Sequence, residues 1–97
     1  MSSRNQRAGT FLRQLVLTNQ YGLHARPAAL FVKTALRYDA DVSVEKGGTV
    51  VSGKSIMGLM TLQAAAGSTL KVTATGADAE QALAELEELV DKGFGED

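Results

Sequence analysis

Residues 42–52 read VSVEKGGTVVS. Val42 and Val44 alternate with polar residues, Gly47 and Gly48 interrupt the pattern, and a second run rich in β-branched residues follows. Alternation of this kind on both sides of a glycine pair is typical of two antiparallel strands joined by a tight turn. This stretch therefore predicts a β-hairpin and, with it, an antiparallel sheet.

The segments on either side of the hairpin complete a βαββαβα order. Apolar and β-branched runs predict strands, and apolar residues at helical spacing predict helices. The expected elements besides the hairpin are a strand over 10–18, a helix over 25–38, a short helix over 55–62, a strand over 68–75 and a helix over 79–90. This order favours an α+β fold, an open-faced β-sandwich in which a four-stranded antiparallel sheet carries three helices on one face. We expect a flexible extension over 1–9 and a single domain over 10–97.

The composition excludes several classes of protein. The 97 residues are 44% hydrophobic, which is enough for one modest core. The chain has no cysteine and a single histidine, so we expect no disulfide, no metal site and no cofactor. No apolar run is long enough for a membrane span or a signal peptide, and a net charge of −1 argues against a nucleic-acid binder. We expect a cytoplasmic monomer.

The charge is unevenly distributed along the chain. Residues 1–38 carry six basic side chains and no acidic one, whereas residues 39–97 carry four basic and eleven acidic side chains. One interpretation is an acidic solvated helix near the end of the chain. The other is that a site early in the sequence binds an anion.

The hexamer GLHARP at residues 22–27 is the strongest candidate for chemistry. It places His24 at a strand-to-helix corner, where the first amide groups of the helix have no acceptor and can bind an anion. Arg26 adds a guanidinium, and Pro27 suits the first turn. The helix field should keep the imidazole neutral and nucleophilic, and the hexamer supplies no acidic neighbour. The simpler interpretation is that His24 only caps the helix.

Two motifs resemble those of the HPr family, the histidine-containing phosphocarriers of the phosphoenolpyruvate-dependent phosphotransferase system. GLHARP resembles the family's active-site motif, and residues 54–58, KSIMG, resemble the motif around its regulatory serine. The 31 positions between His24 and Ser55 also fit. The resemblance implies a phosphocarrier rather than an enzyme. In such a carrier His24 accepts a phosphoryl group on Nδ1 from enzyme I and passes it to an enzyme II A component. Arg26 and the backbone amides of Ala25 and Arg26 would hold the phosphoryl oxygens.

The short helix over 55–62 has two interpretations. Ile56, Met57 and Met60 are either core residues or, as the resemblance implies, the surface that docks partners. Ser55 suits a helix N-cap, and the resemblance adds regulatory phosphorylation by an HPr kinase/phosphorylase and binding of a transcriptional regulator.

Some features and alternatives stay open. Tyr21 stands where many family members have a smaller polar residue, and residues 95–97 are interpreted as a plain acidic end. The alternatives are a carrier of the nitrogen-related branch, and a coregulator of a transcription factor that depends on phosphorylated Ser55. A hydrolase fits poorly, because one histidine without cysteine or an adjacent carboxylate provides no deacylating machinery.

Overall fold

The structure is a computed structural model and describes residues 9–96. The predicted extension over 1–9 lies outside the described residues except for Gly9. The elements, in chain order, are β1 (Thr10–Val16), α2 (Ala25–Ala35), β2 (Asp41–Lys46), β3 (Thr49–Ser52), α3 (Ile56–Thr61), β4 (Thr69–Thr75), α4 (Ala79–Asp91) and the short 3₁₀ helix η1 (Gly93–Gly95).

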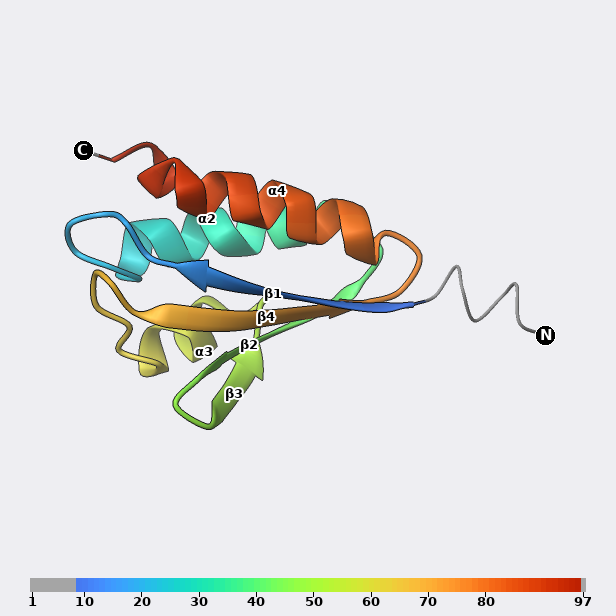
Figure 1. The fold of residues 1–97 in the computed structure, drawn as a ribbon, viewed down its shortest axis with the longest axis horizontal. Helices are drawn as coiled ribbons and strands as arrows, with labels where there is room; N and C mark the ends of the chain where they lie inside the picture. The colour runs from blue at the N-terminus through green and yellow to red at the C-terminus, as the bar shows by residue number, and fades with distance from the viewer. Residues whose placement is uncertain (1–8, 97) are drawn as a thin grey trace.

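The four strands form one antiparallel sheet in the order β1-β4-β2-β3. The hairpin of β2 and β3 turns through Gly47 and Gly48, whose φ angles of +57° and +89° glycine adopts readily. α2 and α4 lie over one face of the sheet (Figure 1). α3 packs on the same face at the far edge, because Gly58 lies against Val51, whose neighbour in register is the buried Val44. The predicted open-faced α+β fold is confirmed.

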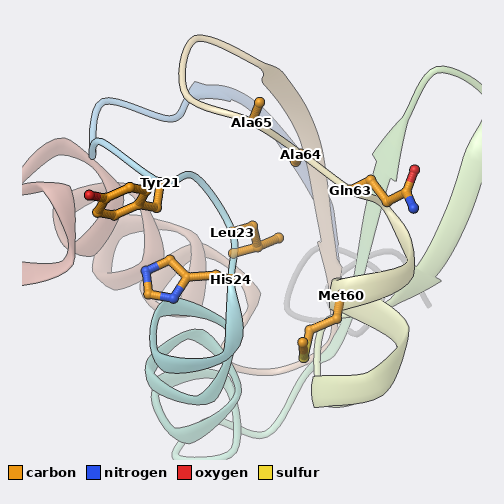
Figure 2. Close-up of a pocket in the computed structure, with 7 residues that line it drawn as sticks. All are labelled: Tyr21, Leu23, His24, Met60, Gln63, Ala64 and Ala65. Carbon is orange, nitrogen blue, oxygen red and sulfur yellow. The ribbon is translucent and has the colours of Figure 1, made fainter.

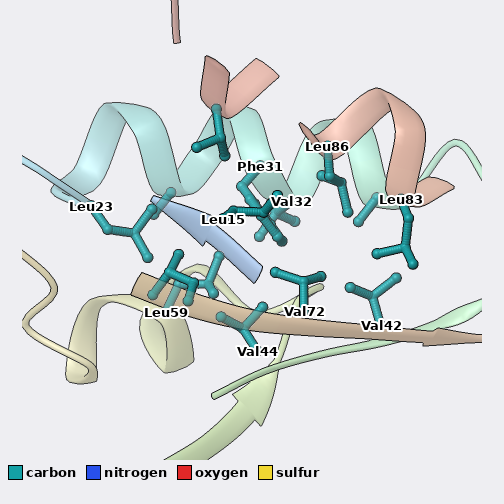
Figure 3. Packing of buried hydrophobic residues seen from close by; sticks show 14 of the residues in the cluster. Leu15, Leu23, Phe31, Val32, Val42, Val44, Leu59, Val72, Leu83 and Leu86 are labelled. Carbon is teal, nitrogen blue, oxygen red and sulfur yellow. The ribbon is translucent and has the colours of Figure 1, made fainter. Parts of the chain in front are cut away.

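The core lies between this sheet face and the helices (Figure 3). Alternate residues of β4 and β2 point into it, and α2 and α4 supply the opposite layer. Phe31, Leu83 and Leu86 are completely buried there. Burial of side chains of this size stabilises a fold by about 2 kcal/mol each, so the core holds the start of α2 firmly against the sheet.

Two element boundaries differ from the prediction by more than one residue. β1 ends at Val16 rather than Thr18, since the next residues turn into the loop that leads to α2. α2 ends at Ala35 rather than Tyr38, because the amides of Arg37 and Tyr38 bond three residues back, to Thr34 and Ala35. Leu36, the C-cap residue, is 61% exposed.

Across residues 9–96 no helix combines the length and the apolar character that crossing a membrane requires.

Candidate functional site

His24 is the N-cap residue of α2, as the hexamer predicted. Its backbone is extended, with φ −85° and ψ −169°, and its carbonyl accepts the first bond of the helix from the amide of Ala28 at 2.9 Å. Within the described chain its imidazole makes no capping hydrogen bond, and it is 40% exposed. His24 thus occupies the N-cap position through its backbone, and its imidazole does not contribute a capping bond.

The start of α2 provides the expected anion-binding groups beside this ring. The amides of Ala25 and Arg26 lie in the first turn, where helix geometry provides no acceptor for them. Arg26 is exposed and lines a cavity of about 460 Å³ together with His24, Tyr21 and residues 94–96. A phosphoryl group bound here would meet backbone donors, a guanidinium and the positive end of the helix dipole.

Close contact between the loop before α2 and the 63–65 loop fixes the backbone path of residues 22–27. The amide of Leu23 donates to the carbonyl of Ala64 at 2.8 Å. Gly22 has φ +67°, and a Cβ atom there would overlap the Ala64 carbonyl oxygen. Glycine at position 22 is therefore required both for its backbone conformation and for the space beside the 63–65 loop.

A second cavity lies between the first sequence motif and the end of α3. Figure 2 shows His24 and Tyr21 on one side of it, and Met60 with the 63–65 loop on the other. Its volume is about 310 Å³. Tyr21 meets the imidazole edge to face, with ring centroids 6.1 Å apart. A partner bound at this depression would contact α3 and the imidazole at once.

Some apolar residues of the α3 segment are buried and others are exposed, as expected if the exposed ones form a docking surface. Leu59 and Leu62 are buried, while Ile56, Met57 and Met60 are 40%, 76% and 41% exposed. Ser55 is the N-cap, and its Oγ accepts a hydrogen bond from the amide of Gly58 at 2.9 Å. The predicted cap is confirmed, and the core interpretation of the three exposed residues is wrong.

The end of the chain corrects two expectations about the site. Glu96 lies against His24, with its Oε2 atom 3.2 Å from Nε2 of the imidazole. An acidic side chain therefore does lie beside His24, and residues 95 and 96 are part of the site rather than a plain acidic end, while Asp97 lies outside the described residues. Figure 1 shows how this occurs, because the chain after α4 returns to the end of the molecule where α2 begins.

The surroundings of Glu96 favour its charged form. The hydrogen bond from Asn19 has the largest effect and lowers the pKa of the Glu96 carboxyl. Burial opposes it as the next largest effect, and His24 and Arg26 lower the pKa further, so that the net shift is downward. The carboxylate is thus ionised next to the imidazole at neutral pH. No group of three or more acidic, histidine or cysteine side chains able to hold a metal occurs among residues 9–96.

Comparisons with known proteins identify the family. Residues 12–92 match the family model described as the PTS HPr component phosphorylation site. The chain belongs to the HPr family. The phosphocarrier protein HPr of Borreliella burgdorferi is 40% identical over 79 residues, which are 81% of this chain and 92% of the relative.

Solved structures of HPr proteins agree with the fold. HPr of Thermoanaerobacter tengcongensis has a TM-score of 0.87 and 42% identity, and the match covers 90% of this chain and 98% of that protein. Crh, the catabolite repression HPr of Bacillus subtilis, has a TM-score of 0.62 and 42% identity over 82% of this chain and 95% of its own. As a member of the HPr family, the protein is a phosphocarrier of the phosphotransferase system and not an enzyme.

Sequence reasoning missed Asn19 and Glu96. Asn19 is 2% exposed, and its amide Nδ2 donates to Glu96 Oε1 at 3.0 Å. A weak signal for this end of the chain was available, since Phe94 stands between two glycines just before the acidic residues. A large apolar residue in such a segment indicates that the chain returns to the core, and Phe94 is indeed buried.

Proposed function

We propose that His24 is the residue that carries the phosphoryl group, on Nδ1, between enzyme I and enzyme II A components in the cytoplasm. The observation that supports this most is the partly exposed imidazole at the N-terminus of α2, beside the amides of the first helical turn and Arg26. The experiment is incubation with enzyme I and labelled phosphoenolpyruvate. An acid-labile label on the wild-type protein supports the proposal.

The transfer is an exchange between two imidazoles. The lone pair of Nδ1 attacks phosphorus in line, while the bond between phosphorus and the donor's ring nitrogen breaks and its electron pair stays with the donor. The protein contributes position and electrostatic stabilisation. The amides of Ala25 and Arg26 are the fixed donors to the phosphoryl oxygens, and the Arg26 guanidinium is the mobile one.

The exposed residues Ile56, Met57 and Met60 are the proposed docking surface for enzyme I. They lie beside the cavity that reaches His24, and methionine side chains adapt to different partners. A partner on this surface would place its own histidine close to His24.

Met57→Glu is expected to raise the apparent Kd for enzyme I at least about tenfold with little change in Tm, because a charge would be buried in an apolar interface. Titration calorimetry and thermal unfolding measure the two effects. Leu12→Glu is the matched control, since Leu12 is 48% exposed on β1, on the opposite side of the sheet from α3. A large fall in Tm with unchanged affinity for enzyme I would mean that Met57 stabilises the fold and does not bind enzyme I.

A second candidate function is regulation through Ser55, and the similarity to the catabolite repression HPr of Bacillus subtilis favours it. An HPr kinase/phosphorylase would phosphorylate Ser55, and a transcriptional regulator would bind the product. Phosphate at the start of α3 suits the helix N-terminus, so the fold survives while docking at the adjacent apolar surface weakens.

Ser55→Asp is expected to raise the carrier concentration needed for half-maximal phosphorylation of His24 about threefold to tenfold, with the saturated rate unchanged. Aspartate also caps helices, so stability stays close to that of the wild type. Ser55→Asn, a neutral cap of similar size, is the control. Coincident concentration curves for Ser55→Asp and wild type would leave Ser55 as a cap alone.

The branch of the phosphotransferase system is a separate question. The nitrogen-related branch uses the same histidine motif with different partners. Rates of phosphorylation of His24 by a sugar-type and by a nitrogen-type enzyme I, measured side by side, distinguish the two.

A further inference from the structure

A chain of hydrogen bonds connects the loop before α2 to the end of the polypeptide. Nδ2 of Asn19 donates to the carbonyl of Gly22 at 2.7 Å and to Oε1 of Glu96 at 3.0 Å. The Glu96 carboxylate then faces Nε2 of His24, with Oε2 at 3.2 Å and Oε1 at 3.4 Å. Two segments distant in sequence, residues 19–24 and the end of the chain at Glu96, therefore meet at one edge of the imidazole.

The acceptors in this network determine where the protons are. A carbonyl and a carboxylate both accept, so Asn19 must present its NH₂ group to them, although its Oδ1 is then buried without a partner in the described chain. An ionised carboxylate cannot donate, so the imidazole nitrogen that faces it must carry the proton. The contact with Glu96 thus selects the tautomer with hydrogen on Nε2 and a free lone pair on Nδ1.

The last turn of the chain holds Glu96 in this position. Phe94 is 5% exposed although its φ is +58°, a conformation that a large side chain rarely adopts without support. The amide of Glu96 donates to the carbonyl of Gly93 at 2.9 Å, and the Glu96 side chain is only 17% exposed. The carboxylate is therefore placed by packing and not by chance contact of a free tail.

We propose that Glu96 is a positioning residue for phosphoryl transfer, which keeps the proton on Nε2 and stabilises the positive charge that the ring gains when Nδ1 is phosphorylated. The inference rests on the proposed function of His24. It assigns a role to the end of the chain that is independent of the oxygen-binding groups at the start of α2.

The charge balance shows why a carboxylate helps at this edge of the ring. Neutral His24, with hydrogen on Nε2, uses its Nδ1 lone pair to form the new bond to phosphorus. The donor's phosphohistidine, protonated on its other ring nitrogen, leaves as neutral imidazole. His24 then carries a dianionic phosphoryl group on Nδ1 and a cationic ring that still holds its Nε2 proton. Glu96 pairs with that cation, while Arg26 and the helix amides pair with the phosphoryl group on the other side.

The first measurement uses the unphosphorylated full chain labelled with ¹⁵N. Imidazole nitrogen shifts at neutral pH are expected to show Nε2–H as the sole observed tautomer in the wild type. Glu96→Ala is expected to add a measurable Nδ1–H population. Glu80→Gln, a change at an exposed position on α4, is the control for loss of one negative charge. This readout is independent of any phosphoryl donor, so it tests the geometry even if His24 is not the acceptor.

The second measurement is the equilibrium of phosphorylation between enzyme I and the carrier. Glu96→Gln keeps the shape of the side chain and removes its charge, and we expect it to shift the equilibrium about two- to fivefold away from phosphorylated His24, as for loss of one partly exposed ion pair. Glu80→Gln should shift it by less. A wild-type tautomer with hydrogen on Nδ1 overturns the inference. Identical tautomers and equilibria in wild type, Glu96→Ala and Glu96→Gln overturn it as well, whereas phosphorylation at another residue overturns the proposed function instead.

Discussion

His24→Ala is expected to abolish the acid-labile phosphate that enzyme I places on the wild-type protein, while the fold persists. The chain contains no other histidine, so no second imidazole can replace the acceptor. The loss of stability should be small, about 1 kcal/mol or less, because the imidazole is partly exposed and makes no cap bond within the described chain.

The measurement compares incorporation of labelled phosphate with the Tm of the same samples. His24→Gln serves as a second variant, since the glutamine amide can keep polar contacts at this position while the nucleophilic imidazole is removed. Acid-stable label on either variant would report a hydroxyl such as Ser55 and would not count as acceptance by His24. Acid-labile label on His24→Ala would show that the site has been assigned wrongly.

Gly22→Ala is expected to lower the free energy of unfolding by about 3 kcal/mol or more. Part of the loss comes from the left-handed backbone, which costs an L-residue about 1–2 kcal/mol. The rest arises because the new methyl group would overlap the carbonyl of Ala64 and push the two loops apart. Since Leu23 and His24 follow directly, we also expect the mutant to accept phosphate from enzyme I at least about tenfold more slowly.

Gly47→Ala separates the two causes. Gly47 has a similar φ of +57°, but no atom lies within 4 Å of the position that its Cβ would occupy. It should therefore show the backbone cost alone and an unchanged rate of phosphorylation. Chemical denaturation of both variants measures the difference. Equal losses of stability would mean that the contact between Gly22 and Ala64 does not hold the loops together.

Local patterns were sufficient for most of the fold and for the start of the site. Three such patterns are the glycine pair in the hairpin, the alternation over 68–75 and the apolar stripe over 79–90. Each depends only on residues that are close together in the sequence, because it reflects either the backbone conformation of a turn or the burial of one face of a strand or helix. The corner at His24 was predictable for the same reason, because a glycine, a proline and the start of a helix follow each other directly. For Ile56, Met57 and Met60 the sequence left a core and a docking interpretation open, and only their exposure in the structure decided between the two.

The sequence by itself thus determined the element order, the antiparallel sheet and the position of His24 at the head of α2. Only the tertiary structure decided what surrounds the imidazole. Glu96 lies 72 positions from His24 along the chain. It reaches Nε2 because Phe94 packs into the core and the buried Asn19, in the loop before α2, donates to its carboxylate. A contact between distant segments depends on how the helices and the sheet pack together, and no periodicity within either segment encodes it. For this reason the carboxylate at the edge of the ring could not be anticipated, although the nucleophile itself could.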